Sequence, residues 1–517
     1  MPPIPMASPP MLVQPMSQGG IAGTQRFISN NRGRILTVQQ ERTVPLWLTS
    51  KSAVFFFVAM IACWAAYGFM PEFTLWIIAS ISVVLFFYGC SSMSRSLSRT
   101  SERHFVRNVF IVGFIIRLLW VLYCYFFFNP EYYNNVYGDD ADTGWYMDFG
   151  RDFADWFRGQ KQISFGRLMD DWTMAVDDMG YPIWLAIVYF LTFGSSDVFI
   201  PFVVKSALGA YCAVSIYRIA KRHYGVGVGR MAALFVIFNP NMIFWCASMM
   251  KEAEMVFLCC LCVDLVDRTF TSGQKLSFKG LLPGVLVGMV LFFFRAPLAI
   301  VLFLAMFAHI VMASGKVMGA GKKIIAGLMV GVVLLIGMGD SLRTQAESIV
   351  EDVQSDKQNV NMEWRAERKG GNAYAKYASA AIFAPLIFTI PFPTFNAASS
   401  EQIIQQILSG GNYIKNILSF FVIYVIIVML LSGEWRRHVF ILAYTLGYLA
   451  CLVLSSFAHS SRFHMPIWPF LLLFAALGIQ MGKTTPRIRR WYPIVLAVEV
   501  VACLAWNWFK LKGRGMI

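Results

Sequence analysis

The sequence predicts an all-α protein that crosses a membrane many times. Of its 517 residues, 57% are hydrophobic and 14% are charged, whereas about a quarter of the residues of a soluble globular chain are charged. The mean hydropathy is +0.58, and aromatic residues make up 15% of the chain, which excludes a disordered protein. These observations exclude a soluble domain and predict a polytopic membrane protein, because such a composition needs a solvent other than water.

Apolar runs that approach the length of a bilayer-spanning helix recur along most of the chain. A helix needs about 20 apolar residues to cross the hydrocarbon core, so we expect about 13 transmembrane helices (12–14) with soft boundaries. The predicted spans are 52–70, 73–89, 108–128, 200–218, 229–247, 253–266, 280–294, 298–313, 324–339, 413–431, 439–457, 466–481 and 492–508. A further apolar stretch, 181–193, is expected to cross the membrane, to dip into it, or to lie along its surface.

The composition along the chain suggests four parts. Residues 1–50 are rich in Pro, Gly, Ser and Met without periodicity, which predicts a disordered tail. That segment has no early apolar stretch, so we expect the first span, rather than a cleavable signal peptide, to direct insertion. Residues 51–107 are predicted to form a helical hairpin and a basic loop, 108–480 the main transmembrane bundle, and 481–517 a basic loop, a last helix and a tail.

The basic residues predict the orientation. The formal net charge is +15, and Lys and Arg collect in the N-terminal segment and in short loops such as 95–107, 218–230 and 483–490. If 181–193 does not cross the membrane, all of these clusters fall on one side, which the positive-inside rule makes cytoplasmic. The N-terminus is then cytoplasmic, and the net charge reflects topology rather than a nucleic-acid partner. The basic tail 510–514 is predicted to lie on the other side.

The two long loops, 129–180 and 340–412, fall on the opposite, outer side. Loop 129–180 carries eleven acidic residues against four basic ones. Loop 340–412 contains an apolar stretch with several prolines at 385–396, too short and interrupted for an ordinary span, so it is predicted to be re-entrant or interfacial. We therefore expect any chemistry on the outer face.

A cluster of aspartates in the first outer loop is the first candidate site. Asp139, Asp140 and Asp142 lie within four residues, next to Trp145 and Tyr146. Three such carboxylates repel one another unless a divalent cation (Mg²⁺ or Mn²⁺) or a bound proton holds them, and a carboxylate that takes up a proton suits a general base. The alternative is a solvated acidic loop.

Two further outer turns carry basic residues. Lys251 and Glu252 follow Asn239-Pro240-Asn241 at the mouth of the predicted bundle, where charges are costly unless they are paired or face water. The second turn places Arg462 between His459 and His464, and a guanidinium beside imidazoles suits phosphate binding. The alternatives are side chains that extend to the headgroups and ordinary loop polarity.

Several other residues stand out inside the apolar runs. Arg117, Lys205 and Arg295 interrupt apolar runs, Arg295 at the outer turn between two predicted spans, and charges of this kind are functional candidates by default. A structural ion pair explains Arg117 equally well. His309 is expected to pack or form hydrogen bonds inside a span, and the ten cysteines, which show no metal-ligand spacing, are expected to be small buried apolar residues.

Taken in chain order, these motifs resemble the GT-C superfamily of polyprenyl-phosphate-sugar-dependent glycosyltransferases, in particular the bacterial members related to protein mannosyltransferases and aminoarabinose transferases. Asp142 and Tyr146 match the spacing of the acidic motif in the first outer loop of that family. The other matching segments are Gly180-Tyr181-Pro182, Ala220-Lys221-Arg222-His223-Tyr224-Gly225, Pro240 through Lys251-Glu252, and Arg462-Phe463-His464-Met465-Pro466. The resemblance covers 108–480, and the hairpin 52–89 precedes what would be the first span of the family.

The resemblance implies an inverting transfer of a hexosyl or pentosyl group from a polyprenyl-phosphate donor to a hydroxyl of a glycan, lipid or protein acceptor. Asp142 is the implied general base, with Asp140 and Asp139 as alternatives. The implied phosphate ligands are Arg462, His464, Lys251, Arg295 and His459, with Glu252 and Tyr146 in support. The implied location is the cytoplasmic (inner) membrane of a bacterium, with the active site on the outer, periplasmic face.

Two other functions account for part of the sequence. An O-antigen or exopolysaccharide polymerase or ligase is also polytopic and uses paired arginines in a large outer loop, a role open to Arg365 and Arg368, but the acidic first loop is then unexplained. A transporter or flippase of a lipid-linked sugar typically has internal repeats and ionisable residues near the bilayer midplane. The sequence shows no repeat between its halves, and its charges gather at one predicted surface.

Overall fold

The computed structural model describes most of the predicted helical bundle. The described residues are 44–68, 73–132, 140–163, 178–194, 196–272, 278–312, 363, 366–367, 372–374, 392–396, 403–454 and 461–517. Within these ranges the regular secondary structure is helical and there is no strand. The predicted span 324–339 and nearly all of the tail 1–50 lie outside the described residues, as does most of loop 340–412.

The N-terminal helices cover the segments predicted as the first three spans. In chain order they are α2 (Leu46–Tyr67), α3 (Phe73–Val84), η1 (Leu85–Gly89), α4 (Cys90–Ser96), α5 (Glu102–Tyr123), η2 (Cys124–Phe128) and α6 (Asn129–Tyr132). The helix α5 begins where the Ser101 hydroxyl accepts a hydrogen bond from the backbone N–H of His104, as expected of a serine N-cap.

The remaining helices carry the candidate site and most of the core. From the acidic loop to the second hairpin they are α7 (Asp140–Phe157), α9 (Gly180–Leu191), α10 (Phe199–Phe238), α11 (Pro240–Phe244), η4 (Trp245–Ala247), α12 (Glu252–Thr271), α13 (Phe278–Phe294) and α14 (Ala296–Met312). The C-terminal group is α18 (Ile403–Ile407), α19 (Ser409–Ser432), η7 (Glu434–Arg437), α20 (Val439–Leu454), η8 (Met465–Ile467), α21 (Trp468–Thr484) and α22 (Pro486–Lys512).

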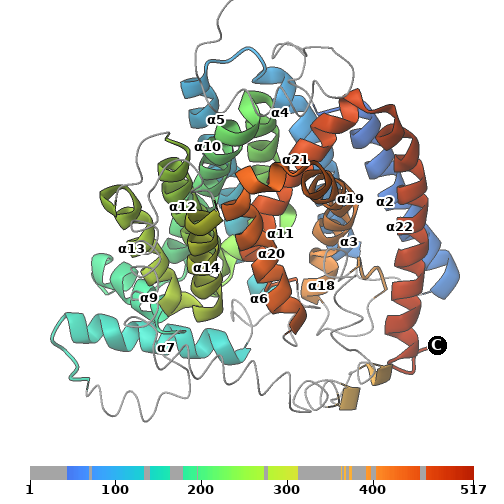
Figure 1. The fold of residues 1–517 in the computed structure, drawn as a ribbon. Coiled ribbons are helices and arrows are strands. Elements are labelled where there is room, and N and C mark those ends of the chain that lie inside the picture. The colour runs from blue at the N-terminus through green and yellow to red at the C-terminus, as the bar shows by residue number, and fades with distance from the viewer. Residues whose placement is uncertain are drawn as a thin grey trace, which may run out of the picture.

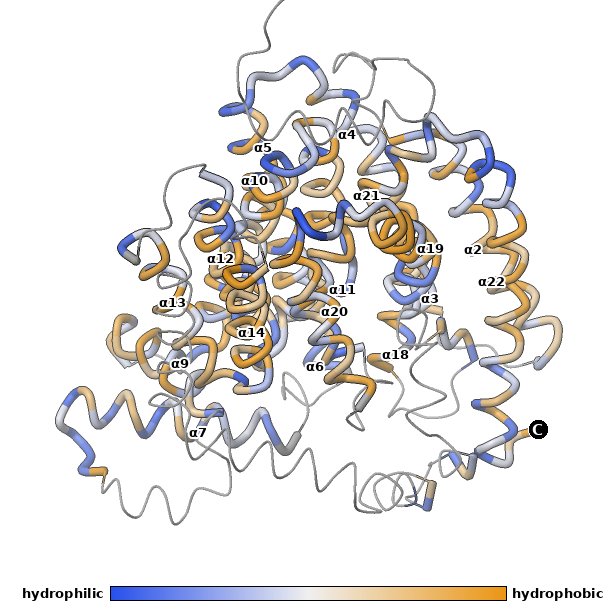
Figure 2. Tube along the Cα trace, viewed as in Figure 1, coloured by the Kyte–Doolittle hydropathy of each residue, from blue (hydrophilic) through white to orange (hydrophobic). Residues whose placement is uncertain are grey.

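The helices confirm a multi-pass membrane protein. Seven helical stretches in the described part of the chain are long and apolar enough to cross a bilayer, and four shorter ones, Gly180–Leu191, Lys279–Phe294, Ala296–Met312 and Val439–Val453, are apolar as well. Figure 2 shows apolar residues along the upright helices and hydrophilic residues toward their ends. The total of about 13 spans stays a prediction.

The long helix α10 is a hairpin of two helices. Forty residues in one straight helix would reach about 60 Å, yet Lys205 near its start donates a hydrogen bond of 2.7 Å to the carbonyl of Ser248, which follows its end. The reversal occurs at Gly225, whose φ of 87° and ψ of 172° are not helical and are accessible almost only to glycine. α10 therefore contains the predicted span 200–218 and the first part of the predicted span 229–247.

One helix lies across the end of the bundle. Figure 1 shows α7 running crosswise below the upright helices, with α9 beside it, and the C-terminus at the same end of the molecule. We call this the α7 end. The helices α7 and α9 pack side by side and run in the same direction. Tyr146 in the first half of α7 contacts Tyr181 at the start of α9, and Phe157 at the end of α7 contacts Phe190 near the end of α9. Both helices therefore run from beneath the bundle toward its edge.

The buried residues that stood out in the sequence have structural roles. Arg117 donates hydrogen bonds to the carbonyls of Gly113, Val236 and Ile237, and no carboxylate among the described residues pairs with it. Its role is therefore to tie α5 to the second half of α10 rather than to form an ion pair. The His309 ring stacks on Phe270 at 4.0 Å, and all ten cysteines are free and at least half-buried, as expected.

Candidate functional site

The structure brings three predicted site residues into one ion-pair cluster. The Arg462 guanidinium lies 3.2 Å from Asp142 and also pairs with Glu252. Asp142 comes from α7, Glu252 from the first residue of α12, and Arg462 from the turn after α20. These residues are separated by up to 320 positions in the chain. We call Asp142, Glu252 and Arg462 the ion-pair cluster.

The first half of α7 packs against α9 and against the residues just before α12. Tyr146 lies one helical turn further on, buried, and its ring meets the ring of Tyr181 edge-on at 5.0 Å. A side chain at Gly150 would collide with Leu185 of α9, so glycine allows the two helices to approach closely. Thr143 donates a hydrogen bond to the sulfur of Met250, just before α12. Packing therefore fixes the position of Asp142 beneath the bundle.

The start of α12 supplies two more ion pairs. Lys251, which is 2% exposed, pairs with Asp178 from the end of the acidic loop. Lys205 of α10 is fully buried, lies 3.5 Å from Glu254, and donates hydrogen bonds to the carbonyls before α12. Its ammonium group also lies 4.7 Å from the centroid of the Tyr181 ring, a cation–π contact. The buried cations Lys205 and Lys251 therefore each have a carboxylate partner, as buried charges require.

Burial and charge act on the two groups whose protonation matters most here. Burial would lower the pKa of Arg462, but the carboxylates of Glu252 and Asp142 outweigh it and raise the pKa above its ordinary value. Burial raises the pKa of the Tyr146 hydroxyl, and the negative charges of Asp142 and Glu252 raise it further. Arg462 is therefore a permanent cation, and Tyr146 stays a neutral hydroxyl at physiological pH.

The two residues that follow Arg462, Phe463 and His464, contact basic side chains of other helices. Arg295 occupies the break between α13 and α14, and its guanidinium lies 4.4 Å from the centroid of the Phe463 ring. His464 is fully buried, and its Nδ1 lies 2.7 Å from the Nζ of Lys415 in α19. The turn that carries Arg462 thus joins the cluster to two further basic side chains.

Sequence reasoning missed three of these residues. Asp178 precedes the Gly180-Tyr181-Pro182 motif by two positions, and Glu254 follows Glu252 by two positions in α12. Lys415 belongs to a buried polar stripe of α19 at helical spacing, which consists of Ser409, Asn412, Lys415, Asn416 and Ser419. That stripe inside an otherwise apolar span was the signal that could have identified Lys415.

Some predicted site residues lie outside the described residues. Asp139 and His459 are among them, and Asp140 begins α7 without a described side chain. In the described part of the chain, no three His, Cys, Asp or Glu side chains are placed to hold a metal ion. A divalent cation on Asp139, Asp140 and Asp142 therefore stays a prediction.

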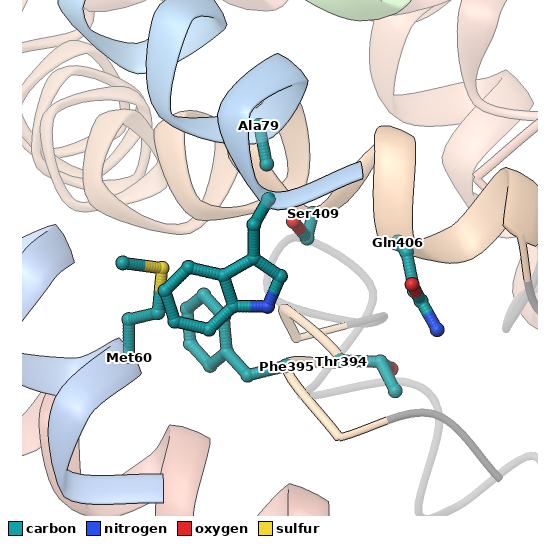
Figure 3. Close-up of a pocket in the computed structure, with 7 residues that line it drawn as sticks. Met60, Ala79, Thr394, Phe395, Gln406 and Ser409 are labelled. Atoms are coloured by element: carbon teal, nitrogen blue, oxygen red, sulfur yellow. The ribbon is translucent and has the colours of Figure 1, made fainter. Parts of the chain in front are cut away.

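A small cavity lies away from the ion-pair cluster. It is lined by Met60, Trp76, Ala79, Thr394, Phe395, Gln406 and Ser409, so α2, α3, the segment 392–396 and the junction of α18 with α19 enclose it (Figure 3). None of the predicted site residues lines this cavity.

No family model matches the chain, and neither a curated protein nor a solved structure matches it. The functional assignment therefore rests on the residues of this chain.

Proposed function

We propose that the protein is an integral-membrane glycosyltransferase of the GT-C type. It moves a sugar from a polyprenyl-phosphate donor to an acceptor hydroxyl, and the α7 end is the outer, periplasmic face of a bacterial inner membrane. The observation that supports this proposal most is the meeting of Asp142, Glu252 and Arg462 at the membrane boundary. A general base and a phosphate ligand belong to the same site, because they act on opposite sides of one sugar carbon, with donor and acceptor between them.

The balance of charges suggests how the donor binds. Within the ion-pair cluster, the single cation Arg462 faces two carboxylates, Asp142 and Glu252. With all three ionised, both carboxylates compete with an incoming phosphate for the one guanidinium. A donor phosphate therefore gains most by replacing a carboxylate at a cation, and Asp142 is the carboxylate of the cluster that is most exposed, at 36% of its side chain against 1% for Glu252.

In the proposed reaction, the donor phosphate takes the place of Asp142 at Arg462. The released Asp142 accepts the proton of the acceptor hydroxyl, whose oxygen attacks the anomeric carbon from the face opposite the phosphate. The bond from that carbon to the phosphate oxygen breaks, and Arg462 stabilises the charge that develops on the leaving phosphate, with Lys251 and Arg295 nearby. The configuration of the sugar is inverted.

Substitution of the aspartates tests the base. Purified protein in liposomes that contain polyprenyl-phosphate sugars would be assayed for transfer to an added acceptor glycan. We expect Asp142→Asn to lower transfer by about 10²–10⁴-fold, the range for loss of a general base, without loss of membrane insertion. Asp148→Asn, on the exposed side of the same helix, is the matched control and should retain activity.

The same assay with Asp139→Asn and Asp140→Asn decides which carboxylate acts. Loss of transfer in only one of the three variants identifies the base. Full activity in all three would exclude the mechanism.

A further inference from the structure

The outer ends of α7 and α9 carry exposed aromatic and aliphatic side chains. Phe193 is 99% exposed and Leu191 is 67% exposed, just after and at the end of α9. Trp156 and Phe157 at the end of α7 are each 38% exposed, and the ring of Phe157 contacts Phe190. We call these five residues the aromatic tip.

The aromatic tip has a fixed conformation. The N–H of Gly194 bonds to the carbonyl of Tyr189, as in a helix C-cap, and Arg158 of α7 donates a hydrogen bond of 2.7 Å to the same carbonyl. Phe193 has a φ of 55°, a left-handed conformation that costs a bulky residue about 1–2 kcal/mol. The hydrogen bonds that close the end of α9 hold Phe193 in this conformation, with its side chain fully exposed.

The length and direction of α9 exclude a crossing of the bilayer. Its 12 residues reach about 18 Å, whereas the hydrocarbon core is about 30 Å thick. The helix also runs alongside α7, which lies crosswise at the end of the bundle (Figure 1). The stretch 181–193 therefore ends at the same side of the membrane as it begins.

The helix α9 begins beside the exposed apolar side of α13. The start of α9 packs against the end of α13, because a side chain at Gly180 would meet Phe293 and Phe294. Phe293 is 42% exposed, and the same side of α13 exposes Leu282, Leu286, Met289 and Val290. These residues of an apolar helix in a multi-pass protein face lipid. The start of α9 lies against this end of α13, and Ile187, Phe190 and Leu191 are exposed further along α9, so lipid is the occupant that this position favours over a second copy of the chain.

The charges of α7 fit the same position. Its polar side carries Asp148, Asp152 and Asp155, which pair with Arg151 and, just after the helix, with Lys161 and Arg158. Such a helix, charged on one side and aromatic on the other, lies in the plane of a membrane interface with its apolar side about 5–10 Å into the boundary of headgroups and acyl chains.

We propose that the aromatic tip inserts into the bilayer interface at the α7 end and holds α7 and α9 flat against the membrane. This inference does not depend on the catalytic proposal, because it follows from the exposure and direction of two helices.

The depth of Phe193 tests the proposal. Phe193→Cys and, as the matched control, Asp148→Cys would each carry a nitroxide label in proteoliposomes of phosphatidylglycerol and phosphatidylethanolamine, with the unmodified chain giving the background from its own cysteines. We expect collisions of the label at position 193 with oxygen to exceed those with a water-soluble nickel complex several-fold, at a depth of about 5–10 Å. The label at position 148 should show the reverse order. Leu191→Cys gives a second reading of the same surface.

Three results would overturn the proposal. A label at position 193 as accessible to nickel as the label at 148 would mean that the aromatic tip lies in water. A label at the bilayer centre, or one that nickel reaches only from the other side, would mean that α9 crosses. Strong spin–spin broadening at position 193 would mean that a second copy of the chain covers the surface.

Discussion

At the scale of single residues, Arg462 holds the candidate site together because it serves two carboxylates at once. Its guanidinium is planar and carries several N–H donors, so it can bond Asp142 and Glu252 from different edges. A lysine at this position would present a single charged point. The same donors suit a phosphate. Arg462 therefore has two roles to distinguish: stabilising the fold through its ion pairs and, as proposed, binding the donor phosphate.

A pair of substitutions separates these two roles. Arg462→Gln leaves the buried Glu252 without its partner, and breaking a buried ion pair in this way costs about 3–5 kcal/mol of unfolding free energy. Arg462→Gln combined with Glu252→Gln removes the uncompensated charge, so we expect most of the thermal stability in detergent to return while transfer stays at least about 10²-fold down. Arg151→Gln, in an exposed pair with Asp148, should change stability by no more than about 1 kcal/mol.

Recovery of transfer in the double variant would contradict a direct role of Arg462 in binding the donor.

The environment of His438, at the end of the bundle opposite α7, should make the stability of the protein depend on pH. Its Nδ1 lies 3.2 Å from Nδ1 of His223, whose other ring nitrogen bonds Asp267 at 2.6 Å. Burial, together with His223, lowers the pKa of His438 to about 3, although Asp267 acts in the opposite direction. The folded protein thus keeps His438 neutral at a pH where the unfolded chain protonates it.

The sign of this effect follows from proton uptake. Below the unfolded pKa of about 6.5, the unfolded chain binds a proton that the folded one does not, so the free energy of unfolding falls by at most about 1.4 kcal/mol per pH unit. Partial exposure of His438 reduces this value. Thermal unfolding between pH 7 and pH 5 should therefore show a steeper loss for the natural chain than for His438→Gln. Equal slopes would contradict the assignment.

At the scale of elements, the segment 392–396 is held by one asparagine of α22. The Asn507 amide accepts hydrogen bonds from the backbone N–H groups of Phe395 and Asn396, and donates to the carbonyl of Pro393 at 3.1 Å. Asn507 is fully buried. This contact fixes the predicted re-entrant or interfacial stretch to the last helix, on the side of the small cavity.

Asn507→Ala should release that segment. Each buried backbone group left without a partner costs about 1–3 kcal/mol, so we expect faster hydrogen exchange in peptides that cover 392–396 and a lower melting temperature. Trp508→Ala changes the neighbouring, 47% exposed residue of the same helix and should leave the exchange of these peptides unchanged. Exchange at the natural rate in Asn507→Ala would show that other contacts hold the segment.

The turn within α10 lies between two spans that the sequence predicts separately. The sequence predicts two spans, 200–218 and 229–247, because a loop with basic residues such as Lys221 and Arg222 separates two apolar runs. In the structure the chain turns at Gly225, and the backbone at Gly229 lies close to the backbone carbonyl of Tyr217. The backbone conformation at Gly225 requires glycine, and a side chain at Gly229 would press on the carbonyl of Tyr217.

At the scale of the whole molecule, composition is enough to predict the class of protein, because apolar length is the main requirement for crossing a bilayer. The site is harder to predict. Asp142, Glu252 and Arg462 were each identified from local sequence, and their common position was expected only from their predicted side of the membrane. Asp178 and Lys415 were missed because partners far apart in the chain are set by packing, which leaves no local pattern.

The state of Arg462 with a donor lipid present tests the central claim most directly. A structure of the protein in a lipid nanodisc with added polyprenyl phosphate would show what the guanidinium contacts. The proposal predicts a phosphate against Arg462, with Asp142 moved away from it and Glu252 still paired. An intact Asp142–Arg462 pair, with the polyprenyl phosphate bound elsewhere on the protein, would contradict the proposed donor site.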